Sequence, residues 1–211
     1  MPFSAILVVI VVAAAVALVV GVRANLTRSR EGKAFAFVAL FILPGIAVWV
    51  GYNEQMDRAE SKTFCLSCHV MADYGKSLYV DDPSYIPALH FQNNYVPRDR
   101  ACYTCHTDYT MFGTLNSKIR GVRHVLVEYF GTIPKPENIK LYTPFNNREC
   151  LYCHLGARKF EEGRAHSRTP DQMARIKSNQ LSCTSSHCHD IVHEVATLKD
   201  AILWKETPAQ Q

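Results

Sequence analysis

The sequence has little net charge, which argues against a nucleic-acid partner. Its 211 residues include 23 basic and 19 acidic side chains, for a formal charge of +4. Four of the basic residues and one acidic residue fall within residues 23–33, so the rest of the chain holds 19 basic and 18 acidic residues. Proteins that bind nucleic acid need a concentrated positive surface, which this composition does not supply. We therefore expect no nucleic acid among the partners.

Charge is missing altogether from two apolar stretches near the N-terminus. Residues 2–22 and 34–52 contain no Asp, Glu, Lys or Arg. Each is long enough to cross a bilayer as a helix, which takes roughly 20 apolar residues. A cleaved signal peptide is the alternative for the first stretch, but the basic residues that open a signal peptide are absent before Ala5. We predict an N-terminal two-helix transmembrane hairpin over residues 1–52.

The charges between the two stretches predict the orientation of this hairpin. Arg23, Arg28, Arg30 and Lys33 lie in the connection, and loops rich in Lys and Arg stay in the cytoplasm. Both ends of the hairpin then face outward. We expect a protein of the bacterial inner (cytoplasmic) membrane, in which residues 53–211 form a domain facing the periplasm.

No cysteine lies outside four short motifs. The eight cysteines form four pairs, and each pair is followed at once by a histidine. The motifs are Cys65-Leu-Ser-Cys68-His69, Cys102-Tyr-Thr-Cys105-His106, Cys150-Leu-Tyr-Cys153-His154 and Cys183-Thr-Ser-Ser-His187-Cys188-His189. At such a spacing two thiols bond to the vinyl groups of one haem, and the adjoining imidazole binds its iron. The sequence predicts four covalently bound c-type haems, and their attachment in bacteria takes place in the periplasm.

The fourth motif departs from the usual spacing. Four residues separate Cys183 from Cys188, where each of the other pairs has two. A disulfide or a zinc site is the alternative for this pair. We favour haem attachment, because it accounts for all eight cysteines in the same way.

Few residues are left to build an ordinary hydrophobic core. Residues 53–211 provide about 40 residues per haem, too few to enclose four porphyrins and also form a separate core. We therefore predict a mostly α fold with low regular secondary structure: a multihaem cytochrome c domain carried on the transmembrane hairpin. Apolar spacing predicts helices at residues 110–130, ended by Gly131, and at residues 190–205. Prolines make residues 134–144 a loop, and residues 157–180 should be partly helical.

Four irons with two axial positions each require eight ligands. The motif histidines supply at most four of them, namely His69, His106, His154 and His189. Further candidates are His90, His166 and His193, together with the thioether of Met71.

The position of His193 predicts which haem it serves. It follows His189 by four residues, so on a helix both imidazoles project from one face. The two ligands of one iron lie on opposite sides of the porphyrin, so His193 should bind a different haem from His189. His124 is open to three interpretations, as a haem ligand, a proton acceptor or a residue of the helix surface. We assign no role to His187.

The sequence also resembles a known family. Residues 48–56, leading into residues 64–71, are similar to the membrane exit and first haem motif of the tetrahaem quinol dehydrogenases. This family includes the small membrane subunit of cytochrome c nitrite reductase and the quinol-oxidising cytochrome of periplasmic nitrate reductase. The similarity continues in His90-Phe-Gln-Asn, Arg148-Glu-Cys and Cys188-His-Asp-Ile-Val-His193.

The resemblance implies oxidation of menaquinol or another quinol near the first haem, with Met71 as an axial ligand. Electrons would pass to a periplasmic or membrane-bound redox protein complex. Lys118 matches a family lysine that is a haem ligand or lies at the quinol site. The acidic residue expected about seven positions later is Val125 here, so His124 and Glu128 are the alternatives for accepting protons. We expect the quinol site to contain Lys118 and His124.

The first apolar stretch departs from the family, which usually has one membrane helix, matched here by residues 34–52. We expect the additional helix to dock a further membrane subunit. A second hypothesis follows from it: a pure electron-relay subunit of a larger respiratory membrane complex, with no quinol site of its own. A terminal reductase with substrate at an open iron is a third hypothesis. We do not favour it, because every motif has candidate iron ligands and no substrate pocket can be read from the sequence.

Overall fold

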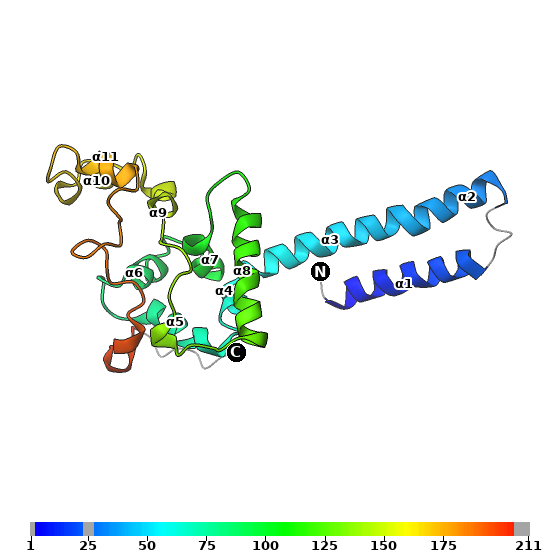
Figure 1. Ribbon diagram of the computed structural model, residues 1–211, viewed down its shortest axis with the longest axis horizontal. Coiled ribbons are helices and arrows are strands. Elements are labelled where there is room, and N and C mark those ends of the chain that lie inside the picture. The colour runs from blue at the N-terminus through cyan, green and yellow to red at the C-terminus, as the bar shows by residue number, and fades with distance from the viewer. Residues whose placement is uncertain (1–2, 23–27, 205–211) are drawn as a thin grey trace. The chain divides into compact units, whose positions relative to one another are not determined.

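The computed structural model of the protein describes residues 3–22 and 28–204 (Figure 1). It divides into two compact units, Met1–Ala59 and Glu60–Gln211. The division falls later than the predicted one between residues 52 and 53, because the last helix of the first unit continues to Arg58. The described residues are mostly helical and contain no β-strand, in agreement with the predicted fold class.

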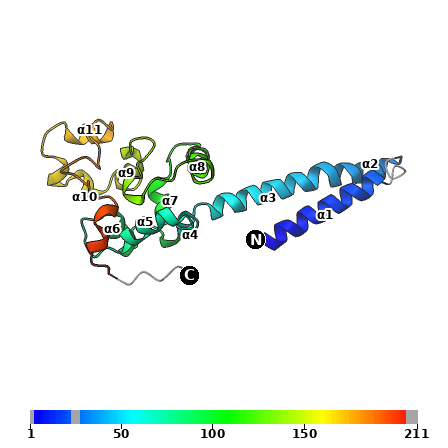
Figure 2. The same ribbon diagram turned by 60° about the horizontal axis from the view of Figure 1, so that its bottom comes forward.

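The first unit consists of two helical segments that lie side by side (Figure 2). α1 covers Phe3–Val22. The second segment runs without a break through α2 (Arg30–Phe37), the π-helix Val38–Ile42 and α3 (Leu43–Arg58). α1 contacts both α3 and the π-helix.

One helix of this unit has the length and composition to cross a membrane. Among the described residues it is the continuous segment Arg30–Arg58. Ile10–Val19 forms a shorter apolar stretch within α1. A membrane anchor near the N-terminus is therefore supported for one helix, and the two-helix transmembrane hairpin stays a prediction.

The π-helix is explained by Pro44. A proline has no amide hydrogen, and its ring collides with the carbonyl group one turn earlier. Here the Leu43 amide donates to the Val38 carbonyl, five residues back. This wider turn makes room for the proline ring, so the helix continues through it.

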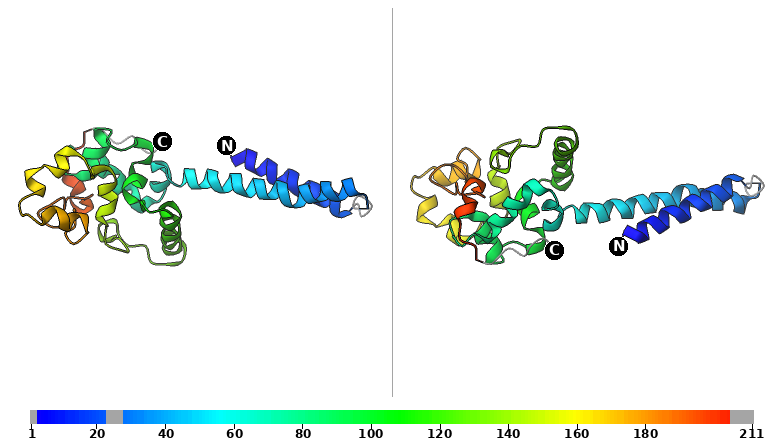
Figure 3. Two further views of the ribbon diagram at one scale, coloured as in Figure 1. Left: turned by 90° about the horizontal axis from the view of Figure 1, so that it is seen from above. Right: turned by 90° about the horizontal axis from the view of Figure 1, so that it is seen from below.

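The second unit is a set of short helices joined by loops (Figure 3). Its α-helices are α4 (Lys62–Cys65), α5 (Ala72–Lys76), α6 (Ile86–Gln92), α7 (Ala101–His106), α8 (Gly113–Phe130), α9 (Asn147–His154), α10 (Arg158–Glu161) and α11 (Gln172–Lys177). Single 3₁₀ turns cover His69–Met71, Ser77–Tyr79, Arg98–Arg100, Pro136–Asn138, Arg164–His166 and Val195–Asp200. α8 is the longest of these elements and lies at the margin of the unit.

Buried apolar side chains of this unit form three small clusters rather than one core. The clusters are Leu78, Phe91, Val96 and Ala101; Val80, Tyr85, Ala88 and Leu198; and Leu151, Phe160 and Ile176. Each cluster is too small to stabilise a unit of this size by itself. This agrees with the expectation that polypeptide alone does not provide the core.

Two predicted helices have different outcomes. α8 begins three residues later than predicted and ends at Phe130, where the amide of Gly131 bonds back to the Val127 carbonyl. The helix predicted at residues 190–205 is wrong: residues 190–194 are not helical, and only a 3₁₀ turn follows at Val195–Asp200.

Candidate functional site

Six of the nine histidines face one another in three pairs. The ring centres of His106 and His193 are 6.2 Å apart, with an angle of 18° between the ring planes. His90 and His154 are separated by 6.0 Å, and His166 and His189 by 6.2 Å. Each pair joins one motif histidine to one of the distal candidates.

These separations fit a haem iron bound from both sides. An imidazole nitrogen binds a metal at about 2 Å and its ring centre lies about 1 Å farther back, so two imidazoles on one iron hold their centres about 6 Å apart. All three pairs have this spacing. The residues present therefore fit three haems with two histidine ligands each.

Hydrogen bonds orient the three distal histidines for the same purpose. The Nδ1 atom of His90 donates to the Ile86 carbonyl at 2.8 Å, and that of His166 donates to the Phe160 carbonyl at 3.0 Å. A carbonyl oxygen only accepts, so the proton sits on Nδ1 and the lone pair is on Nε2. Nε2 is then the free metal ligand.

His193 obtains the same orientation from a hydroxyl group. Its Nδ1 lies 2.7 Å from Oγ of Ser77, which is fully buried. The Ser77 hydroxyl already donates to the Tyr74 carbonyl at 2.7 Å, so it accepts the proton of His193 Nδ1. Sequence analysis missed Ser77, because no local pattern connects it with a histidine 116 positions later.

The helix predicted around His193 is absent. His193 has a φ of 67°, in the left-handed region, and not a helical conformation. Its ring nevertheless faces His106 of the second motif, and His189 faces His166. The turn of the backbone, rather than a helix face, separates the two rings.

The first motif has no such pair. His69 and Met71 lie in a single 3₁₀ turn, and within residues 28–204 no aromatic ring packs against that of His69. His69 is exposed and Met71 is partly buried. The first motif therefore differs from the other three in its surroundings, as a site for a different ligand set would.

The four motifs lie next to one another in their order along the chain. α4, which ends at Cys65, contacts α7 of the second motif, and α7 contacts α9 of the third motif. Cys183 of the fourth motif packs against the apolar cluster that contains Leu151 of α9. The Cys102 thiol lowers the pKa of Cys65 to about 7, and burial raises the pKa of Cys105. Motifs one to four are thus neighbours in sequence order.

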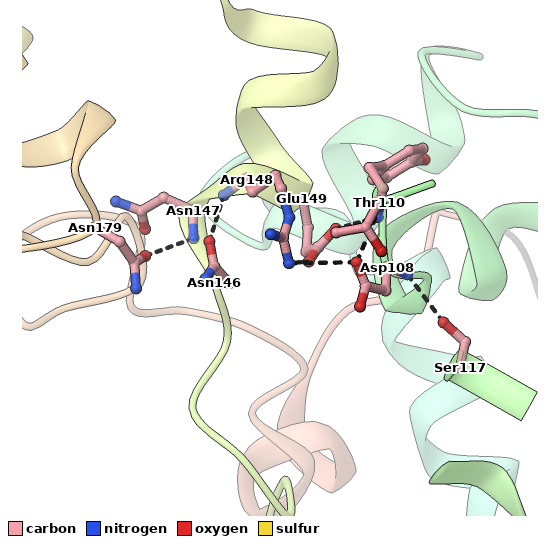
Figure 4. Close-up of polar contacts among 9 residues, drawn as sticks. Asp108, Thr110, Ser117, Asn146, Asn147, Arg148, Glu149 and Asn179 are labelled. Carbon is pink, nitrogen blue, oxygen red and sulfur yellow. Dashed lines mark hydrogen bonds and ion pairs between the residues drawn. The ribbon is translucent and has the colours of Figure 1, made fainter. Parts of the chain in front are cut away.

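A buried amide fastens the fourth motif to the third. Asn147, 1% exposed at the start of α9, donates from Nδ2 to the Ile176 and Leu181 carbonyls. Its Oδ1 accepts the Cys183 amide at 2.8 Å, and its own amide donates to Oδ1 of Asn179 (Figure 4). Asn147 therefore holds the loop that carries the unusual motif.

A second polar network joins the second motif to the third (Figure 4). The Arg148 guanidinium lies 3.3 Å from the buried Asp108 carboxylate and 3.7 Å from that of Glu149. Glu149 accepts the Tyr109 amide at 3.2 Å, and burial raises the pKa of its carboxyl group. The Asp108 amide donates to Oγ of Ser117 on α8. One cation thus holds two carboxylates where α7, α8 and α9 meet.

Lys118 lies close to the first motif. Its Nζ is 4.6 Å from the centre of the Tyr103 ring, and its positive charge lowers the pKa of Cys65. Burial lowers the pKa of Lys118, and the nearby Glu60 raises it. Glu60 and Tyr103 also line a pocket of about 350 Å³. The predicted quinol-site lysine is therefore beside the first attachment site.

His124 lies on another side of α8. It is six residues from Lys118, which turns it by about 120° around the helix axis. Its ring centre is 4.9 Å from that of Tyr142, and burial and Arg123 lower its pKa. Glu128, one helical turn after His124, is a second residue of α8 near the first motif: after burial, the charge of its carboxylate contributes to raising the pKa of Cys68.

The described residues give no support to the two alternatives for the fourth motif. All eight cysteines are free thiols. No group of three or more His, Cys, Asp or Glu side chains in the described part of the chain is arranged to hold a bare metal ion.

Comparison with known proteins identifies the family. The description "NapC/NirT cytochrome c family, N-terminal region" matches residues 27–198. The denitrification system component NirT of Stutzerimonas stutzeri is 26% identical over 159 residues, which are 69% of this chain and 75% of NirT. The cytochrome c-type protein NapC of Escherichia coli K12 is 25% identical over 122 residues, 52% of this chain and 58% of NapC. NapC of Haemophilus influenzae is 22% identical over 75% of this chain and 80% of its own length.

No solved structure matches this chain. The match to the family covers residues 27–198, and this range contains all four motifs and the three histidine pairs. The family resemblance inferred from the sequence is confirmed, and membership implies covalently bound c-type haem. This chain belongs to the NapC/NirT cytochrome c family.

Proposed function

We propose that the protein is a membrane-anchored tetrahaem cytochrome c that oxidises menaquinol or another quinol and relays the electrons to a periplasmic redox partner. The observation that carries this proposal is the arrangement of the four motifs as neighbours in sequence order, three of them with a facing pair of histidines. Closely spaced carriers in a row are what an electron relay requires.

The chain would hold one haem at each motif. The thioether bonds would form at Cys65, Cys68, Cys102, Cys105, Cys150, Cys153, Cys183 and Cys188. The proposed iron ligands are His69 or Met71 at the first motif, His106 with His193, His154 with His90, and His189 with His166. When bound, each haem supplies one-electron chemistry through the change in valence of its iron.

The proposed quinol site adjoins the first motif. Cys65 follows the last residue of α3 by seven positions, and an extended chain of seven residues reaches at most about 25 Å. A lipid-soluble donor at the membrane surface is thus within reach of the first haem. Lys118 beside Cys65 supplies a positive charge that favours the deprotonated quinol.

We favour Glu128 over His124 and Glu60 as the proton acceptor, because the charge of its carboxylate acts on Cys68 of the first motif. Glu60 is bound to Arg100 at 2.7 Å, and a paired carboxylate is a poor base. Glu128 approaches Cys68 and makes no ion pair within the described residues. His124 stays a candidate on the side of α8 that faces Tyr142.

Quinol-dependent reduction of the purified protein tests the proposal. A menaquinol analogue should reduce the haems without any other protein present. Reduction only after addition of a second membrane subunit would instead identify a pure relay, which the additional apolar stretch of residues 2–22 favours.

The haem count has its own prediction. Because each haem adds roughly 0.6 kDa, four covalent haems should raise the intact mass about 2.5 kDa above that of the polypeptide, which is 23.8 kDa. Mass spectrometry under denaturing conditions measures this directly. Three adducts, with Cys183 and Cys188 unmodified in a peptide map, would contradict haem attachment at the fourth motif.

The proposed topology places the basic connection in the cytoplasm and residues 53–211 in the periplasm of an inner membrane. A reporter enzyme that works only in the cytoplasm should therefore be active when it is fused after Arg28. A reporter enzyme that works only in the periplasm should be active when it is fused after Gln211. A cytoplasmic C-terminus would rule out the proposed orientation.

A further inference from the structure

One face of α8 is apolar and uncovered. Its stripe consists of side chains at helical spacing, and they are 45–75% exposed: Leu115, Ile119, Val122, Leu126 and Tyr129. Phe112 continues the stripe before the helix, and Phe130, 85% exposed, continues it at the end. An apolar face of this length is unusual on a surface that meets only water.

The centre of the stripe points away from three side chains of α8 that face the rest of the unit. With 100° per residue, the stripe is centred about 180° from Ser117, His124 and Glu128. Those three side chains face the rest of the unit, since Ser117 accepts the Asp108 amide, His124 lies against Tyr142 and Glu128 approaches Cys68. Lys118, beside the first motif, lies at the border of the stripe, about 60° from its centre. A haem attached at the first motif would therefore lie along one border of the stripe and would leave its centre uncovered.

α8 is also close to Glu60, the first residue of the second unit. Lys118 of α8 is near enough to Glu60 for the carboxylate to raise its pKa, although burial lowers that pKa overall. Glu60 follows the end of α3 by two residues. Tyr52, the last residue of the uncharged stretch, is eight residues before Glu60, or about 12 Å if the chain is helical.

The charges of α8 indicate what lies against the stripe. The helix carries Lys118, Arg120 and Arg123 and one acidic residue, Glu128, for a formal charge of +2. Arg123 lies at the border of the stripe, 4.0 Å over the Tyr142 ring. An apolar face, basic residues beside it and aromatic residues at both ends are typical of a helix in the plane of an anionic membrane surface.

We propose that α8 lies in the membrane surface, with its apolar stripe among the acyl chains and its basic residues among anionic lipid headgroups. This inference rests on the proposed membrane anchor but not on quinol oxidation. It gives the haem unit a second attachment besides the covalent connection through Glu60. The first motif is then held near the membrane surface, where a quinol would leave the lipid.

Spin labels on the full-length, haem-loaded protein test the inference. In nanodiscs of phosphatidylcholine containing one quarter phosphatidylglycerol, nitroxide labels are placed at Ile119→Cys and Leu126→Cys. Asn116→Cys, exposed on the polar side of the same helix, is the matched control. Collisions with oxygen, which concentrates in lipid, are compared with collisions with a water-soluble nickel chelate.

Both stripe labels should have an oxygen-to-nickel collision ratio severalfold above that of the control. The difference should shrink in nanodiscs of phosphatidylcholine alone, because the headgroup attraction is lost. Equal ratios at all three positions would place the stripe in water. Low collision rates with both reagents at the stripe would mean that a second copy covers it. Either outcome overturns the inference, and neither alters quinol-dependent reduction or the reporter fusions.

Discussion

Replacing His193 by alanine should convert one haem from low spin to high spin while four haems stay attached. Its imidazole faces that of His106 at 6.2 Å, and Ser77 fixes its Nδ1 atom. Loss of this ligand leaves the iron of the second motif with one histidine, which favours high spin. The thioether bonds at Cys102 and Cys105 do not depend on it. Magnetic circular dichroism should show about one quarter of the haem changed, with the intact mass otherwise the same.

Two variants control for the backbone at this position. His193 has a left-handed φ of 67°, which alanine tolerates poorly and glycine tolerates well, so His193→Gly should give the same spectrum with less loss of stability. His187→Ala alters a histidine with a similar φ of 68° and no ring partner among the described residues, and it should leave the three haems with facing histidine pairs low spin. Loss of the haem at Cys183 and Cys188 in the His193 variants would show a folding role for His193 and contradict its assignment as a ligand of the second motif.

Local sequence patterns predicted the parts of the site that are local. The four motifs, the helix α8 and the position of Lys118 follow from spacing within a few residues or from the family resemblance. Asn147 and Ser77 do not, because their partners are 29 to 36 and 116 residues away. No periodicity identifies a buried amide or hydroxyl whose bonding partner in the site is distant in the sequence.

The C-terminal segment shows why apolar spacing misled the prediction of a helix. Ile191, Val195 and Leu198 are indeed buried or partly buried on one side, but against Val80 and Tyr85. The segment uses its backbone groups for this packing. The Ile86 amide donates to Ile191, the Asp81 amide to Ile202 and the Trp204 amide to Tyr79. These bonds to a distant segment replace the bonds of a helix, and tertiary packing decides the local structure.

The facing pairs also indicate how a chain with small apolar clusters is held together. His193 comes from the C-terminal segment and His106 from the second motif, while His90 comes from α6 and its partner His154 from α9. In each case an iron would join segments that are distant in sequence. Ligands bound only by the native state stabilise it, so the haems are expected to contribute stability that the three apolar clusters lack.

The largest expected effect on activity is at Lys118 and Glu128. Lys118→Met removes the charge beside Cys65, and Glu128→Gln removes the carboxylate near Cys68 with almost no change of shape. A positioned base contributes roughly a hundredfold or more to a proton transfer. Each variant should therefore slow reduction by a menaquinol analogue about a hundredfold in stopped-flow measurements. The low-spin haems, which lie beyond this site, should keep their spectra.

His124→Phe is the matched comparison on the same helix. Its ring lies against Tyr142, and phenylalanine preserves that aromatic contact. Quinol-dependent reduction should change less than about twofold, within the range of a small packing effect. A slow His124→Phe variant together with a normal Glu128→Gln variant would identify His124 as the proton acceptor. Normal rates in all three variants would mean that quinol is not oxidised here and that electrons enter from another subunit.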